Sequence, residues 1–371
     1  MHTDIWLKLL YLETFSAKKL FALLMKDIPL ADLMCLTPKG LITLGFTQQQ
    51  AERWQTIDES KIDQARCWLE QPHHALLTIL DTDYPILLKE IPDPPIALFV
   101  KGNKHLLASL QLAIVGSRNP TSMGKETAFA FANYLADRGL VITSGLATGI
   151  DAAAHRGTLE TSGKTIAVCG SGLNSIYPTR HRELAAQIAS SGALISEFPL
   201  HASAQPHHFP KRNRIISGLS LGVLVVEAAQ RSGSLITARL AAEQGREVFA
   251  IPGSIHNPLA RGCHGLIRQG AKLVETAADV LEELAPLANI STASPENQVV
   301  EKADPTPILE EDHQQLLNHI DYEPTPIDVL VARSGMKIEA VSSMLLLLEL
   351  NSLVKSEVGG YRKINTNRTS L

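Results

Sequence analysis

The middle of the chain alternates short runs of hydrophobic residues with stretches in which hydrophobic residues recur at helical spacing. The short runs predict strands at Leu76–Leu80, Ile96–Val100, Leu112–Gly116, Val141–Ser144, Thr165–Gly170, Ala193–Glu197, Leu221–Glu227, Val248–Ile251 and Lys272–Val274. Helices are predicted between most of the later strands, at Lys125–Arg138, Ile150–Leu159, Thr179–Ser190, Leu235–Gln244 and Ala260–Gln269. Several strands are unbroken apolar runs, which are typical of parallel sheets covered by helices on both faces. Residues 73–286 are therefore predicted to form a doubly wound, mostly parallel α/β domain.

The segments before and after this domain have different patterns. Residues 1–72 carry leucines at near-helical spacing, interrupted by Pro29, Pro38 and Gly40, which predicts a small domain of short helices. Such helices either bind nucleic-acid backbones or only pack against protein, and packing is the commoner role. Residues 287–307 are polar, contain prolines and lack periodicity, as expected of a linker.

Residues 308–371 have the outline of a winged helix. Helices are predicted at Glu310–Ile320, Ile327–Ser334 and Lys337–Leu350, followed by a hairpin around Gly359. The third helix is rich in leucine and has few cations, whereas a DNA-reading helix is normally basic. Contact with DNA, contact with protein and a purely structural role therefore stay open for this domain.

The segment His207–Gly218 concentrates positive charge. Lys211, Arg212 and Arg214 fall within four residues, just after Pro210. Proline disfavours helix in the residue before it, so we expect an extended approach and a short helix that opens around Asn213. Cations at a helix start conflict with the helix dipole, and a bound anion would remove that conflict. A solvated basic turn is the alternative.

Small residues follow the carboxyl ends of the predicted strands, where ligands bind in open α/β sheets. Glycine allows close approach of a ligand to the backbone, and serine hydroxyls with exposed amides suit phosphate oxygens. The loops and the basic segment supply Gly116, Ser117, Arg118, Ser144, Gly145, Gly170, Ser171, Gly172, Lys211, Arg212, Asn213, Arg214, Ser232, Gly233 and Ser234. Together these residues predict an anion site along one edge of the sheet.

Composition limits what that site can be. The net charge of −4 gives no global attraction to nucleic acid, so a polyanion site must be a local concentration of charge. The four cysteines are scattered without a Cys-x-x-Cys pair, which favours a reduced, cytosolic protein without a zinc site. We expect no metal, no cofactor, no signal peptide and no membrane insertion.

Two motifs that suggest nucleotide chemistry fail on inspection. Gly157 and Gly163 are one residue too far apart for a phosphate-binding loop of the P-loop type, and a strand follows instead of preceding them. The loop at Gly170 resembles a dinucleotide fingerprint but does not open a helix directly. Asp151 and His155 are spaced to share a helix face, and a structural pair or capping acid is favoured over a catalytic dyad.

Five ordered motifs across the α/β domain resemble the DprA/Smf family of DNA-processing proteins. They are Ile114–Arg118 (IVGSR), Ser144–His155 (SGLATGIDAAAH), Phe209–Ser220 (FPKRNRIISGLS), Ser232–Arg239 (SGSLITAR) and Phe249–Gly253 (FAIPG). The resemblance implies an extended Rossmann fold that binds single-stranded DNA without catalysis. It also implies a homodimer that protects incoming strands and loads the RecA recombinase during natural transformation.

Site residues follow from the same resemblance. It implies phosphate contacts from Arg118, Lys211, Arg212 and Arg214, and backbone or hydroxyl contacts from Ser144, Gly145, Gly170, Ser171 and Gly172. Many relatives have arginine where this chain has Thr148, so that contact is in doubt. Single-strand binders also use aromatic stacking, and the nearest candidates, Phe209 and Tyr177, are expected to serve mainly in packing.

An enzyme is the alternative function. Nucleotide N-glycosidases of the lysine-decarboxylase-like family share this type of fold, but their Pro-Gly-Gly-x-Gly-Thr-x-x-Glu loop is absent. The corresponding stretch from Arg231 to Thr237 lacks the acid that this chemistry would use.

Overall fold

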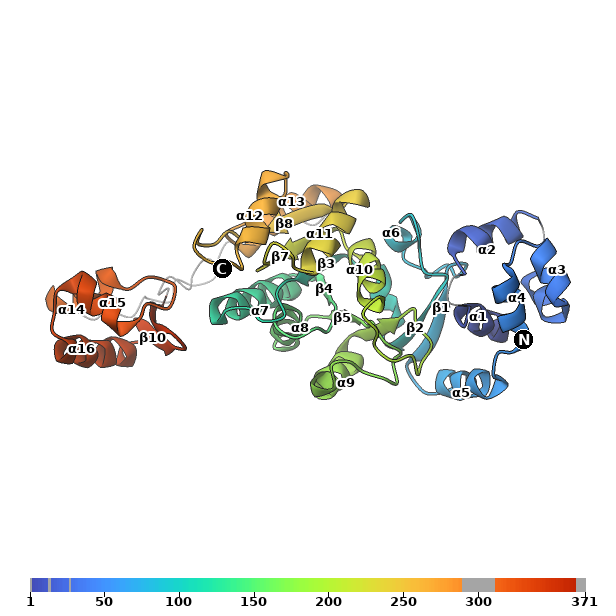
Figure 1. Cartoon of the computed structure of the whole chain (residues 1–371), viewed down its shortest axis with the longest axis horizontal. Coiled ribbons are helices and arrows are strands. Elements are labelled where there is room, and N and C mark those ends of the chain that lie inside the picture. Colours follow the sequence, from blue (N-terminus) through green and yellow to red (C-terminus); the bar gives the residue numbers. More distant parts are fainter. Residues whose placement is uncertain (1, 13–14, 27, 289–310, 365–371) are drawn as a thin grey trace. The chain divides into compact units, whose positions relative to one another are not determined.

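The computed structural model describes residues 2–12, 15–26, 28–288 and 311–364. The chain divides into two compact units, residues 1–290 and 291–371, and each is described by itself. The linker predicted at 287–307 lies outside the described residues except for its first two, which end a helix. Both units appear in Figure 1.

A nine-stranded sheet forms the centre of the first unit, in the order β1-β2-β6-β5-β4-β3-β7-β8-β9. The strands are β1 (His74–Thr78), β2 (Ala97–Gly102), β3 (Gln111–Val115), β4 (Val141–Ser144), β5 (Thr165–Val168), β6 (Ala193–Ser196), β7 (Gly222–Val225), β8 (Glu247–Ala250) and β9 (Lys272–Leu273). The strands from β6 to β9 are parallel, whereas β2 pairs antiparallel with β6 and with β1. The strand order reverses between β3 and β7, which makes that position the topological switch point.

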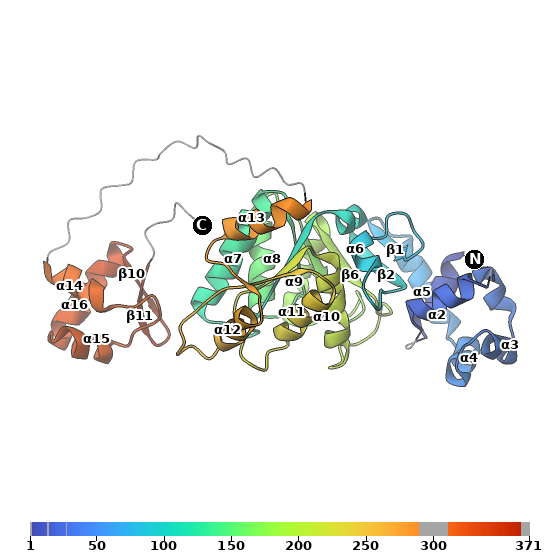
Figure 2. The same ribbon diagram turned by 90° about the horizontal axis from the view of Figure 1, so that it is seen from above.

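Helices cover both faces of the sheet, as the unbroken apolar strands predicted. Figure 2 shows α7 (Ser122–Asp137), α8 (Ile150–Leu159) and α13 (Ala277–Ala288) on one face, opposite α10 (His208–Leu219), α11 (Ser234–Glu243) and α12 (Arg261–Arg268). Alternate residues of β3 serve the two cores: Leu112 and Ile114 pack under α7 and α8, while Ala113 and Val115 belong to the other cluster. The helix α9 (Arg182–Ser191) packs beside α8 in a third cluster.

Short helices form the N-terminal part of the same unit. They are α1 (His2–Leu10), α2 (Ala17–Leu24), η1 (Leu30–Cys35), α3 (Pro38–Thr43), α4 (Gln48–Gln55) and α5 (Glu59–Leu69). The N-cap predicted at Thr47 is a full capping box with Gln50. Buried Leu9 and Leu20 share one hydrophobic cluster with Ile96 and Ile215 of the α/β domain, so the two parts form a continuous core.

The second unit is a winged helix. Its elements are α14 (Glu311–His319), α15 (Ile327–Ser334), α16 (Ile338–Leu350), β10 (Val354–Glu357) and β11 (Gly360–Lys363). Gly335 ends α15 in the left-handed region at φ 69°, which glycine adopts without strain. Leu316, Leu330 and Leu345 are fully buried and join the three helices. The predicted fold class, an α/β domain between a helical and a winged-helix domain, is confirmed.

Two helices differ from the expectation. The approach to the basic segment is helical and not extended: α10 begins at His208, and Pro210 lies in its first turn. First-turn amides have no partner within the helix, so proline is tolerated there. The helix α13 was not predicted; its Ala277, Val280 and Leu284 pack against α7 as the last layer of the domain.

Candidate nucleic-acid interface

The loops singled out by the sequence meet at the carboxyl edge of the parallel strands. Arg118 follows β3, the segment from Gly145 follows β4, the segment from Gly170 follows β5, and Ser232–Ser234 precede α11 after β7. The amino-terminal end of α10 lies over this edge, because Gly170 packs beneath the ring of Phe209. The switch point between β3 and β7 is therefore lined by predicted site residues.

An exposed aromatic and cationic cluster occupies this edge. The Arg118 guanidinium carbon lies 5.2 Å from the centre of the Phe209 ring. The Tyr177 ring also lies beside the Phe209 ring, with centroids 5.8 Å apart, and Tyr177 remains 51% exposed. Arg118 is exposed as well. Tyr177 is thus not a core residue, contrary to the expectation for it. Its position in the loop after Gly170–Gly172 was the signal that could have placed it at the edge.

Arg212 is buried in the protein, not exposed in the groove. Its Nη1 donates to the carbonyl oxygens of Gly145 and, at 2.7 Å, of Val168, which joins the ends of β4 and β5. Only 4% of Arg212 is exposed. Burial lowers the pKa of the guanidinium, and the nearby Asp151 carboxylate opposes that shift. Arg212 therefore serves as the hydrogen-bond donor that the buried carbonyl groups of Gly145 and Val168 need.

The three cations of α10 do not converge on one point. Successive helical residues are about 100° apart, so the side chains of Arg212 and Arg214 leave the helix roughly 160° apart. Arg214 pairs with Glu197 and lies 3.4 Å from Asp93, whereas Lys211 lies 3.7 Å from Glu197 and is 42% exposed. Burial raises the pKa of Glu197, and Arg214 and Lys211 oppose that shift. Of the three, Lys211 is the one that faces solvent.

Most polar groups of the small-residue loops already bond within the fold. The Ser144 hydroxyl donates to Ile114 O at 2.6 Å, and the Ser171 hydroxyl donates to Ser175 O at 2.7 Å. The backbone amides of Ser117 and Gly172 donate to Glu227 O and Ala202 O. A side chain at Gly116 would collide with Ile150 on α8. The glycines and serines of these loops therefore fix the backbone at the carboxyl edge of the sheet through bonds within the protein.

The remaining predicted site residues lie on α10 and at the start of α11. Asn213 is buried on α10, next to Arg212. Ser232 and Ser234 bond to each other through their hydroxyls at 2.7 Å, where α11 begins at Ser234 after Gly233. Thr148 donates its hydroxyl to Arg118 O at 3.0 Å and so fixes the loop that carries Arg118.

Asp151 and His155 have separate structural partners. The Asp151 carboxylate accepts from the amides of Gly145 and Ala147 at 3.1 and 3.3 Å, and burial raises its pKa. His155 Nδ1 lies 2.7 Å from the Thr165 hydroxyl, and burial lowers the pKa of the imidazole to about 3. A structural role is thus favoured for both residues, although they do not pair with each other and Asp151 is not a helix cap: the N-cap of α8 is Gly149, and Asp151, in the first turn, binds the preceding loop.

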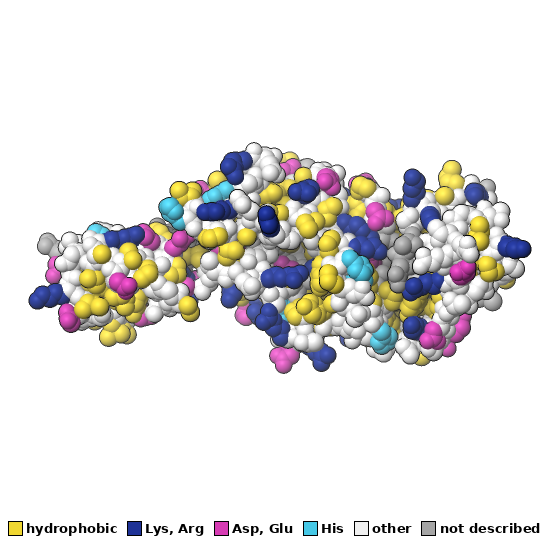
Figure 3. Space-filling view, in the orientation of Figure 1, with side chains coloured by type: hydrophobic (Ala, Val, Ile, Leu, Met, Phe, Trp, Pro, Cys, Tyr) yellow, Lys and Arg dark blue, Asp and Glu magenta, His cyan; other side chains and the backbone are white. Residues whose placement is uncertain are grey.

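The surface around the edge is mixed in character. Figure 3 shows Lys and Arg side chains of the central domain interspersed with hydrophobic ones, without a continuous basic band. Within the described ranges, no group of three or more potential metal ligands occurs. No helix in the described part of the chain is long and apolar enough to cross a bilayer.

The sheet order, the switch-point edge and the flanking domains define a Rossmann-type protein with its ligand edge beside β3 and β7. Residues 75–285 match the family model of DNA recombination-mediator protein A. Residues 1–67 match the SMF/DprA SAM domain, and residues 300–360 match the DprA winged helix domain. The chain belongs to the DprA/Smf family of DNA-processing proteins.

Individual relatives cover most of the chain. Protein Smf of Escherichia coli is 47% identical over 321 residues, which are 86% of this chain and 85% of that protein. The X-ray structure of DNA processing protein A from Streptococcus pneumoniae matches with a TM-score of 0.66 at 38% identity, covering 76% of this chain and 97% of that one. DNA processing protein A from Helicobacter pylori, known for its single-stranded DNA binding mode, matches with a TM-score of 0.53 at 30% identity, covering 58% and 98%.

Proposed function

We propose that the chain binds single-stranded DNA along the carboxyl edge of its parallel sheet. The observation that carries this proposal is the exposed cluster in which Arg118 lies over Phe209 and Tyr177 flanks the same ring. Aromatic faces can stack on bases only where those bases are not stacked on their neighbours, which favours single strands over duplex. The single-stranded DNA binding of the H. pylori relative supports the same assignment.

Two cations contact phosphates in this proposal. Arg118 and Lys211 are the exposed cations of the predicted set: Arg118 lies over Phe209 in the loop after β3, and Lys211 on α10 lies 5.7 Å from the centre of the Phe198 ring. Arg212 and Arg214 have a structural role in this proposal. Arg212 donates to the carbonyl oxygens at the ends of β4 and β5, and Arg214 forms an ion pair with Glu197. The glycines and serines at positions 116, 117, 144, 145, 170–172 and 232–234 and Asn213 give the edge its shape and bring the strand close to the backbone.

We further propose the family's biological role for this chain. A homodimer in the cytosol would cover incoming single strands and deliver them to the RecA recombinase. Binding alone suffices for this role, so we assign no catalytic residue. N-glycosidase activity is not proposed, because the acid after β7, Glu227, accepts from the amide and the hydroxyl of Thr121 at 2.9 and 2.6 Å.

The salt dependence of binding tests the phosphate contacts. Each phosphate neutralised on a single strand contributes about 0.7 to the slope of log K against log salt. We expect Arg118→Ala to weaken binding to oligo(dT) and to flatten the slope by about that amount, measured by fluorescence anisotropy across salt concentrations.

The matched control is Arg138→Ala. Arg138 is also an exposed arginine over an aromatic ring, 3.4 Å from the centre of Tyr134, but it lies at the end of α7. An Arg118→Ala slope equal to those of the wild type and Arg138→Ala would contradict the proposed contact.

A further inference from the structure

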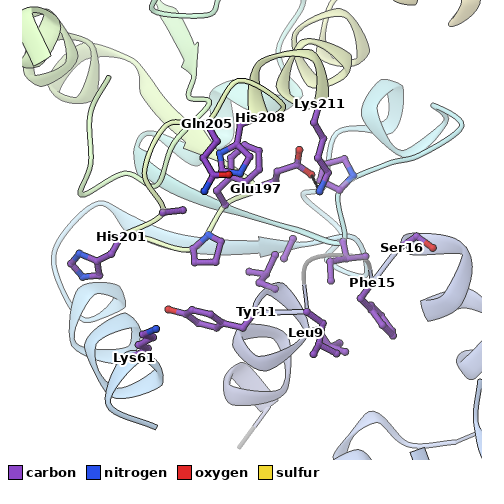
Figure 4. A pocket seen from close by; sticks show the side chains of 18 of the residues that line it. Leu9, Tyr11, Phe15, Ser16, Lys61, Glu197, His201, Gln205, His208 and Lys211 are labelled. Carbon is purple, nitrogen blue, oxygen red and sulfur yellow. Dashed lines mark ion pairs between the residues drawn. The ribbon is translucent and has the colours of Figure 1, made fainter. Parts of the chain in front are cut away.

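The hollow between the N-terminal helices and the segment joining β6 to α10 contains charges that pair with one another. Figure 4 shows Lys211 beside Glu197, and the two charged groups lie 3.7 Å apart. Arg214 also lines the hollow and lies 3.4 Å from Asp93. Because these charges are paired within the chain, the hollow does not indicate a ligand. The winged-helix unit, in contrast, exposes hydrophobic side chains that its own fold does not use.

The helix α16 contains more leucines than the core of this unit needs. Leu345 and Leu348 are fully buried and pack against the other two helices and the hairpin. Leu346, Leu347 and Leu350 are 59%, 44% and 73% exposed. Solvent-facing positions of a surface helix are normally polar. Folding of the winged helix therefore does not explain these three leucines.

The exposed leucines belong to one side of α16. Apart from Ile338 in the first turn, the exposed residues of this helix recur at three- and four-residue spacing and form a single stripe. This α16 stripe consists of Glu339, Ser342, Ser343, Leu346, Leu347 and Leu350. Its first half is small and polar, and its second half is large and apolar. Exposed apolar patches of this kind mark contact sites on soluble proteins.

The charge of the helix favours a protein partner over DNA. The sequence of α16 contains neither lysine nor arginine, so the stripe offers no cation to a phosphate. Of its two acids, Glu339 lies at the amino-terminal end of the stripe. The other, Glu349, accepts a hydrogen bond from the Ser356 amide of β10 at 3.1 Å. Leucines gain free energy when they leave water, so another apolar surface is the partner that fits.

The stripe is complementary to itself when two copies of α16 pair antiparallel. With Leu346 and Leu347 at the twofold axis, Leu350 of one copy lies opposite Ser343 of the partner subunit, so large side chains meet small ones. Glu339 then lies beyond the end of the partner's helix, and its carboxylate stays in water. Parallel pairing would instead place the two Glu339 carboxylates together.

We propose that two copies of this chain contact each other through their α16 stripes in antiparallel orientation. The stripe supplies six residues per copy, fewer than the roughly 20–30 per partner of a standard interface, so the contact is weak by itself. It forms at high protein concentration, or between chains held together elsewhere, where the effective concentration is higher. The contact adds a surface to the homodimer proposed above and does not depend on DNA binding.

Crosslinking between copies of the full chain tests the contact. Leu347→Cys places a thiol beside the proposed axis. Val329→Cys is the matched control, because Val329 is a 37% exposed hydrophobic residue on the neighbouring helix α15. Serine replaces the exposed Cys35 and Cys67 in both proteins. A short bismaleimide is added across a range of protein concentrations, and we expect covalent dimers from Leu347→Cys in excess over Val329→Cys.

A designed charge pair tests the orientation. In the Leu347→Cys protein, Leu350→Asp should lower the dimer yield about tenfold, because each copy loses a buried leucine. Adding Ser343→Arg should restore the yield, since the two substituted side chains face each other only in the antiparallel pair. Val358→Asp is the control and should change nothing, because Val358 is fully exposed between β10 and β11. Thermal unfolding checks that all variants fold equally.

Three results overturn the proposal: equal dimer yields from Leu347→Cys and Val329→Cys, a yield that Leu350→Asp leaves unchanged, and a loss that Ser343→Arg does not restore. Sedimentation separates this contact from the homodimer as a whole. A chain that sediments as a dimer while the two yields stay equal refutes the α16 contact alone. A chain that stays monomeric at every concentration refutes both.

Discussion

Arg212 joins the ends of two neighbouring strands, since its Nη1 donates to Gly145 O after β4 and to Val168 O at the end of β5. This arrangement depends on the absence of a side chain at Gly145, where a Cβ atom would overlap the guanidinium. The glycine that the sequence suggested for close ligand approach therefore also accommodates a buried arginine.

We expect Gly145→Ala to reduce the free energy of unfolding by about 3 kcal/mol, because Arg212 would be displaced from its carbonyl partners while still buried. Urea denaturation measures the change. Gly265→Ala is the control: no atom lies within 4 Å of its added Cβ on α12, so it should be neutral or stabilising by up to about 1 kcal/mol. Equal stability of the two variants would contradict the account of Arg212.

Among the elements, the strands of the sheet were the most predictable. All nine overlap strands that the sequence predicted, and the inner strand β7 (GVLV) contains no polar residue, because a strand buried on both faces leaves no position that favours one. The start of α10 was not predictable from Pro210, since a proline in the first turn and a proline before a helix look alike in sequence. The direction in which each cation of α10 points depends on its position in the helix. Those directions could therefore not be predicted without knowing that the helix begins at His208.

The elements α8, β5 and β4 are joined by a buried polar chain with a pH dependence. His155 on α8 contacts the Thr165 hydroxyl of β5, which donates to Ile142 O of β4 at 2.6 Å. The pKa of His155 is lowered to about 3 by burial, below its unfolded value. Its neutral form therefore contributes stability that is present above about pH 6.5 and is lost as the pH falls toward 3.

Between pH 7 and pH 5, this term should reduce the stability of the wild type by about 2 kcal/mol relative to His155→Gln. Urea denaturation of both proteins at the two pH values measures the difference. Asp151 and Glu197 have raised pKa values, which oppose this trend in both proteins equally, so only the comparison isolates His155. Parallel pH profiles would exclude a buried neutral His155.

For the whole molecule, the sequence motifs come together at the edge of the sheet where we propose that DNA binds, but they did not distinguish exposed from buried members of the predicted set. Arg118 and Arg212 are both arginines of the predicted set, yet Arg118 is exposed and only 4% of Arg212 is exposed. That difference arises from packing between segments far apart in the chain, which no local pattern records. The sequence left contact with DNA, contact with protein and a structural role open for the winged helix, whose α16 exposes Leu346, Leu347 and Leu350 and not a basic face.

The most direct test of the central claim is photo-crosslinking of the full chain to single-stranded DNA carrying 5-iodouracil, with the linked residues mapped by mass spectrometry. The account predicts crosslinks at Tyr177 and Phe209, which Arg118→Ala reduces and Arg138→Ala does not. Crosslinks confined to the winged helix or to the face covered by α7 and α13, with none at Tyr177 or Phe209, would contradict it.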